Sequence, residues 1–145
     1  MDRQANLDRI LLILRVVAGI IFAAHGAQKL FGAFGGPGLA GVVGMMGPMG
    51  YLVSIGEFFG GLGLIVGLLS RFSAASLIVI MLGAIAMVHG KNGFFSSDGG
   101  FEYNLALIAL LAPIVLAGPG RLFVVGRLLP LPKAPGGERP IPALE

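Results

Sequence analysis

Four long apolar runs constrain the fold of this chain more than any other feature of its sequence. They cover about residues 10–31, 51–69, 72–88 and 103–117 of the 145 residues. A helix rises about 1.5 Å per residue, so roughly 20 apolar residues cross the hydrocarbon core of a bilayer. The sequence therefore predicts an all-α protein, an integral membrane bundle of four transmembrane helices.

The composition agrees with a protein whose main partner is the lipid bilayer. Hydrophobic residues make up 56% of the chain and charged residues 12%, with a mean hydropathy of +0.93, which does not suit a water-soluble globule. The net charge is +3, but the basic residues stand at the ends of the apolar runs instead of in a patch with aromatics, so no nucleic acid is expected as a partner. Cysteine is absent, which excludes disulfides, thiolate catalysis, iron–sulfur clusters and cysteine-based zinc sites.

The basic residues also predict the orientation of the bundle. In a four-span arrangement Lys29 and Lys91 lie on one side, and seven basic residues lie on the other: Arg3, Arg9, Arg71, Arg121, Arg127, Lys133 and Arg139. Cytoplasmic loops carry the excess of lysine and arginine, so both termini are expected in the cytoplasm. Arg15, about one turn inside the first run, is expected to snorkel to the same side.

The connections differ in kind. Residues 32–50 contain eight glycines and no charge, so residues 39–46 are expected to lie in the membrane interface or to dip back into the bundle. Residues 70–73 are expected to form a tight cytoplasmic turn. We assign residues 1–127 to the transmembrane domain and residues 128–145 to a proline-rich cytoplasmic tail, which is either a partner-binding segment or a linker.

Polar residues from all four predicted helices meet at one level, near the outer leaflet. In chain order they are His25, Gln28, Lys29, Glu57, His89, Glu102 and Tyr103. Translocon scales put an ionised side chain at mid-membrane at about 2.5–3.5 kcal/mol, so such residues need partners or a purpose. Glu57 is flanked by glycines that let a neighbouring helix approach closely. Its carboxyl group is therefore either a protonatable group or half of an ion pair with His25 or Lys29.

The residues alone leave two interpretations of this cluster open. It is either a satisfied buried network that locks the bundle, or a site for a small ligand, a quinone head group or proton transfer. Two histidines on separate helices could in principle hold a haem, but no second histidine pair exists and both stand at the rim, so haem is disfavoured. No metal site is predicted, because Met45, Met46 and Met49 are more typical of apolar gap-filling than of soft-metal binding.

Four motifs carry these residues in a fixed order. They are His25-Gly26-x-Gln28-Lys29-Leu30-Phe31-Gly32, Glu57-x-x-Gly60-Gly61 followed by Gly67-Leu68-Leu69-x-Arg71, His89 with Gly93-Phe94-Phe95, and Glu102-Tyr103 before a last helix that ends at Gly118-Pro119-Gly120. From about Leu12 to Gly120 the chain resembles the DoxX family. The resemblance implies four transmembrane helices in a bacterial or archaeal cytoplasmic membrane. For some members it also implies a place in redox complexes, as a subunit of thiosulfate:quinone oxidoreductase or an anchor linked to oxidative-stress and sulfur-handling proteins.

The cluster and the resemblance together suggest a membrane subunit of a redox complex that handles a quinone or a small sulfur oxyanion. In this hypothesis Glu57 and His25 are the catalytic residues, and the substrate is bound by Gln28, Lys29, His89, Glu102 and Tyr103. Electrons would come from a protein partner or a bound organic cofactor; the sequence does not identify a cofactor, and quinone is the candidate. Two alternatives are a small-molecule carrier or channel, which would need a homo-oligomer formed through the glycine-rich second helix, and a non-catalytic membrane anchor or assembly factor.

Overall fold

The computed structural model describes residues 3–122, and these residues form helices and turns without a strand. The five main helices are α1 (Arg3–Phe31), α2 (Gly38–Met46), α3 (Met49–Val66), α4 (Ser70–Ala84) and α5 (Glu102–Ala117). A π-helical segment, Ile85–His89, continues α4 directly. Short 3₁₀ turns at Ala33–Gly35, Gly90–Asn92 and Ser96–Asp98 complete the connections.

Three helical stretches are long and apolar enough to cross a membrane. They are α1, α3 and the continuous stretch Ser70–Asn92, while α5 is an apolar helix of 16 residues. The chain is thus an all-helical, multi-pass membrane protein that contacts the lipid bilayer. A fourth span through α5 and a cytoplasmic location of both termini remain predictions.

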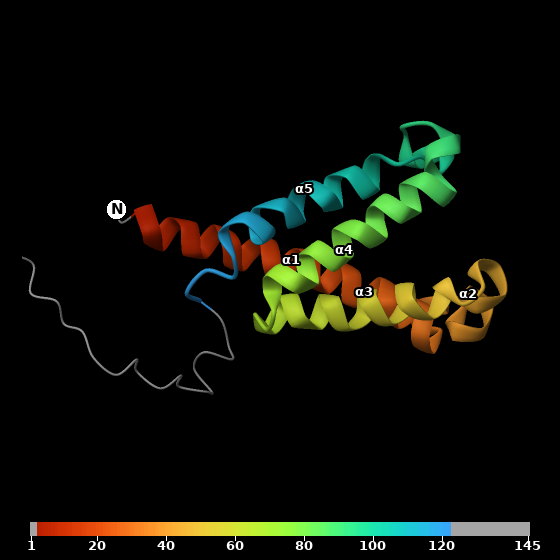
Figure 1. Cartoon of the computed structure of the whole chain (residues 1–145), viewed down its shortest axis with the longest axis horizontal. Helices are drawn as coiled ribbons and strands as arrows, with labels where there is room; N and C mark the ends of the chain where they lie inside the picture. The colour runs from red at the N-terminus through yellow and green to blue at the C-terminus, as the bar shows by residue number, and fades with distance from the viewer. Residues whose placement is uncertain (1–2, 123–145) are drawn as a thin grey trace, which may run out of the picture.

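The helices form two antiparallel pairs, α1 with α3 and α4 with α5 (Figure 1). Glycines allow the first pair to touch backbone to backbone. A Cβ atom on Gly26 would stand 2.3 Å from the Phe58 nitrogen, and one on Gly61 would stand 2.4 Å from the Ala23 nitrogen. Small residues are what permit such close approach between helices in a membrane. The glycine face of α3 is therefore occupied within the chain.

The core is a dry layer that fills the middle of the bundle. It contains Phe22 from α1, Leu64 from α3, Leu77 from α4 and Leu111 from α5, each with an exposed fraction of 1% or less. Along α1 this layer lies between Arg15 on one side and His25 and Lys29 on the other. The two polar ends of the bundle are thus separated by closely packed apolar side chains.

Some predicted boundaries were wrong. The turn expected at residues 70–73 lies earlier, because Gly67 and Leu69 adopt left-handed conformations with φ of 81° and 47°, and α4 already begins at Ser70.

The segment expected at the membrane interface or within the bundle, residues 39–46, forms most of the short helix α2. It packs against α1 and α3, with Val42 buried.

Arg15 does not reach the surface, so its predicted snorkelling was also wrong. Its side chain is fully buried, and Nη2 donates to the Leu122 carbonyl at 2.5 Å, while Nε and Nη1 have no hydrogen-bond partner within residues 3–122. Residues 118–122 fold back along α1 and cover it. The Arg121 backbone nitrogen also donates to the Asp8 carboxylate at 3.0 Å. This second contact holds the same segment against α1 at a position nearer to the N-terminus than Arg15.

Replacing Arg15 with methionine tests whether the hydrogen bond to Leu122 holds residues 118–122 against α1. The substitution keeps an apolar stem in the core but removes the donor to Leu122, so we expect residues 118–122 to detach more often and trypsin to cleave after Arg121 several-fold faster in detergent. Arg9→Met on the exposed side of the same helix is the matched control. Equal cleavage rates in the two variants, measured by mass spectrometry of the fragments, would contradict the assignment.

Candidate functional site

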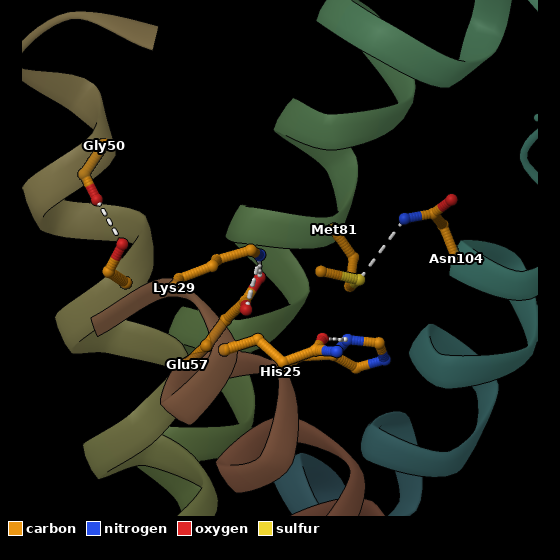
Figure 2. Close-up of polar contacts among 8 residues, drawn as sticks. His25, Lys29, Gly50, Glu57, Met81 and Asn104 are labelled. Atoms are coloured by element: carbon orange, nitrogen blue, oxygen red, sulfur yellow. Dashed lines mark hydrogen bonds and ion pairs between the residues drawn. The ribbon is translucent and has the colours of Figure 1, made fainter. Parts of the chain in front are cut away.

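An ion pair between α1 and α3 is the centre of the polar end of the bundle. Lys29 Nζ lies 2.5 Å from both carboxylate oxygens of Glu57 (Figure 2). The Glu57 side chain is 3% exposed and that of Lys29 is 27% exposed. The close approach of the two helices at Gly26, one turn before Lys29, brings these side chains together. The buried carboxylate is therefore compensated by a cation that is itself reachable from outside.

His25 lies one turn before Lys29 on α1 and is exposed. Its Nδ1 lies 3.3 Å from Oε1 of Gln28, so Gln28 orients the imidazole. The ring also meets Tyr103 of α5 edge to face, with centroids 6.2 Å apart at an interplanar angle of 68°. His25 thus links the α1–α3 pair to the α4–α5 pair.

His89 is presented by the π-helical end of α4. Wider π-helical turns inside a helix frequently mark functional sites. The Nδ1 atom of His89 lies 2.7 Å from the Gly99 carbonyl oxygen, which also accepts from Asn92 Nδ2 at 3.2 Å. The loop that carries Gly99 is closed by its own backbone, since Glu102 N donates to Phe94 O at 2.8 Å.

These side chains surround a pocket of about 340 Å³. Five of the seven residues predicted for the site line it: His25, Lys29, Glu57, His89 and Tyr103. The other two do not. Gln28 contacts His25 from behind, and Glu102 is half-buried at the first position of α5 without reaching the pocket.

Eight lining residues had no role in the sequence-based site, and two of them, Asn104 and Met81, contact each other. Asn104, 6% exposed, donates from Nδ2 to the sulfur of Met81, also 6% exposed, at 3.4 Å. A signal for Asn104 existed, because it directly follows Tyr103 as a polar residue at the start of an apolar helix. Met81 offered no signal, since a methionine in an apolar helix is ordinary core. Phe22 and Leu107 form the apolar floor of the pocket, continuous with the dry layer.

The pocket therefore combines an apolar floor with a few polar groups that converge on it, as small-molecule sites commonly do. It offers a neutralised ion pair, two imidazoles, a phenol and an amide. Within residues 3–122, no three histidine, aspartate or glutamate side chains lie close enough together to hold a metal ion.

Comparison with known proteins places the chain in a family. The family model described as DoxX matches residues 10–90. The chain is 34% identical over 113 residues to a Bacillus subtilis (strain 168) protein named "Putative oxidoreductase CatD", an alignment that covers 78% of this chain and 81% of that protein. It is also 34% identical over 59 residues to an "Uncharacterized protein" of Haemophilus influenzae, which covers 41% of this chain and 39% of that protein. No solved structure matches the chain. Since the family model spans more than half of the sequence, the chain belongs to the DoxX family, and the resemblance inferred from its motifs is confirmed.

Proposed function

We propose that this protein is the membrane subunit of a redox complex and that its pocket binds a quinone head group. The observation that carries the proposal is the convergence of the Lys29–Glu57 ion pair, two imidazoles and the Tyr103 phenol on one pocket of about 340 Å³. This volume is within the range of small-ligand sites. The name of the Bacillus relative, an oxidoreductase, supports a redox role.

The groups in the pocket match the proton chemistry of a quinone. A quinone takes up two electrons and two protons to form the quinol, and the reverse reaction releases them. His25 and Glu57 would exchange the protons, because an imidazole and a carboxyl group can each hold and release one. Lys29, His89 and Tyr103 would contact the two ring oxygens, with Gln28 orienting His25 and Glu102 lying nearby at the start of α5. The electrons would be exchanged with a partner protein that carries a redox cofactor.

The charge of the pocket favours a neutral ligand over a sulfur oxyanion. The Lys29 cation is already paired with both oxygens of Glu57. An anion would have to displace the carboxylate or enter beside it, and like charges at close range in a low dielectric repel strongly. A quinone head group is neutral and meets no such barrier.

The carrier alternative has less support. It depended on dimerisation through the glycines of the second long helix, and these glycines pack within the same chain: Gly61 against α1, and Gly56 and Gly60 against α4. The dry layer below the pocket also closes the bundle to a polar solute. The anchor alternative remains distinct, because it expects soluble partners but no ligand in the pocket, whereas our proposal expects both.

The test is quinone binding by the protein in lipid nanodiscs. We expect a short-chain benzoquinone to bind wild type, and His25→Ala and Glu57→Gln each to weaken binding at least about tenfold, the loss expected when a hydrogen bond to the ligand is removed. Ser54→Ala is the matched control, since Ser54 is buried on the same helix as Glu57 but donates to the Gly50 carbonyl away from the pocket. Binding that is unchanged in both site variants, or no binding by wild type, would rule out the proposal.

A further inference from the structure

Hydrogen bonds around the pocket fix which of its polar atoms are free to accept. A backbone carbonyl oxygen can only accept, so the contact of 2.7 Å between His89 Nδ1 and the Gly99 oxygen places the imidazole proton on Nδ1. The other ring nitrogen, Nε2, then carries a lone pair. In its neutral form His89 is therefore a hydrogen-bond acceptor toward a ligand.

The same logic applies to Asn104. A thioether sulfur carries no proton, so the amide group that contacts Met81 must turn its nitrogen to the sulfur, as Figure 2 shows. The amide oxygen Oδ1 is left without this partner. Asn104 lines the pocket, so this oxygen is a second acceptor available there.

His25 differs from these two residues. Its Nδ1 lies 3.3 Å from Oε1 of Gln28, and a glutamine amide can turn either its oxygen or its nitrogen to the ring, so this contact does not select a tautomer. His89 and Asn104 thus each direct a proton to a protein acceptor and keep an acceptor atom for a ligand. Among the lining donors, Lys29 has two of its three N–H groups engaged by Glu57, and the Tyr103 hydroxyl can either donate or accept.

From this arrangement we infer that the pocket binds the reduced, dihydroxy form of its aromatic ligand more tightly than the oxidised, dicarbonyl form. The inference rests on the proposed function. A quinol brings two hydroxyl donors, which match the lone pairs of His89 and Asn104. A quinone brings only acceptors, so these atoms would lose water without gaining a hydrogen bond, and unpaired buried polar groups weaken binding. The site accordingly discriminates by redox state and favours quinol over quinone.

The experiment compares both redox forms of one ligand on wild-type protein in nanodiscs. Under argon, the quinol of a short-chain benzoquinone is expected to bind at least about tenfold more tightly than the quinone itself. A redox titration gives an independent readout, because each tenfold preference for the quinol raises the midpoint potential of the bound two-electron couple by about 30 mV. The wild-type comparison requires no variant, so the inference stays testable even where a substitution prevents folding.

Two variants assign the preference to named atoms. His89→Phe keeps a ring but removes the lone pair, and Asn104→Leu removes the amide oxygen at similar volume. Each is expected to weaken quinol binding about tenfold and quinone binding less than about threefold, with Ser54→Ala as the control.

The possible outcomes separate this inference from the proposed function. Quinone binding that equals or exceeds quinol binding would overturn the redox preference and leave quinone binding as the function. An unshifted midpoint potential, or equal losses for both forms in both variants, would also overturn the preference. If neither form binds wild type, the proposed function fails together with the inference.

Discussion

Alanine at Gly26 is expected to unfold the bundle or to separate α1 from α3. The added Cβ would stand 2.3 Å from the Phe58 nitrogen and 2.4 Å from its Cα, and these backbone atoms cannot move aside as a flexible side chain can. Overpacking of a well-packed core typically costs about 1–3 kcal/mol, and a clash with backbone belongs at the upper end or beyond. We therefore expect a loss of about 3 kcal/mol in the free energy of unfolding, with loss of the Lys29–Glu57 contact and of quinone binding.

Gly83→Ala on α4 is the matched control. Beyond the backbone of its own helix and its chain neighbours, no atom of residues 3–122 lies within 4 Å of a Cβ built at this position, so the same chemical change has room there. Alanine is also the better helix former, and stability should stay unchanged or rise slightly. The measurement is the fraction of monodisperse protein that survives heating in detergent. Equal survival of the two variants would show that the helices do not meet as described.

Methionine at Lys29 is the second change with a large expected effect. It leaves the Glu57 carboxylate, 3% exposed, without its cation and without both hydrogen bonds. Removing one partner of a buried ion pair costs about 3–5 kcal/mol, and the partial exposure of Lys29 places this case near 3 kcal/mol. Glu57→Gln should cost less, because the stranded ammonium group is 27% exposed and reaches the mouth of the pocket.

A double variant separates the cost of a stranded charge from the value of the pair. Replacing both partners with apolar residues, Lys29→Met with Glu57→Leu, should recover most of the lost stability while leaving no quinone binding. Unfolding by a denaturing detergent gives the four free energies of the cycle. A double variant no more stable than Lys29→Met would mean that the pair does not interact as the geometry indicates.

The helical membrane architecture could be predicted from the sequence, because the length of the apolar runs and the low share of charged residues both indicate membrane-spanning helices. The residues at which the helices begin and end could not be predicted. The first apolar run suggested a start near residue 10, but α1 extends back to Arg3, where residues 118–122 pack along it and Arg121 contacts Asp8. Those contacts join segments that are far apart in the sequence, so the residues around position 3 alone do not reveal them. Arg15 was misjudged for the same reason, since the segment that covers it comes from beyond the last helix.

The sequence predicted which end of each helix contributes to the candidate site. It did not predict the rotation of each helix about its axis, which decides which side chains face the pocket. Polar residues at the same end of four apolar helices are costly in a membrane unless they pair with one another. This reasoning placed His25, Lys29, Glu57 and His89 at a common level. Helix α5 begins with three consecutive polar residues and is apolar all round after them, so its sequence did not indicate which of the three turns inward. Successive residues point about 100° apart, and Glu102 consequently misses the pocket while its neighbours Tyr103 and Asn104 line it. The roles of these residues remain proposals.

The dry layer formed by Phe22, Leu64, Leu77 and Leu111 sets a limit on the energetics of any reaction above it. A proton bound at Glu57 or His25 has no hydrogen-bonded route through these side chains toward Arg15, so it leaves by the opening through which it arrived. Proton exchange at the proposed site would therefore take place with one side of the membrane only. Any contribution to a proton gradient would come from the side on which protons are taken up or released, and not from protons carried through the bundle.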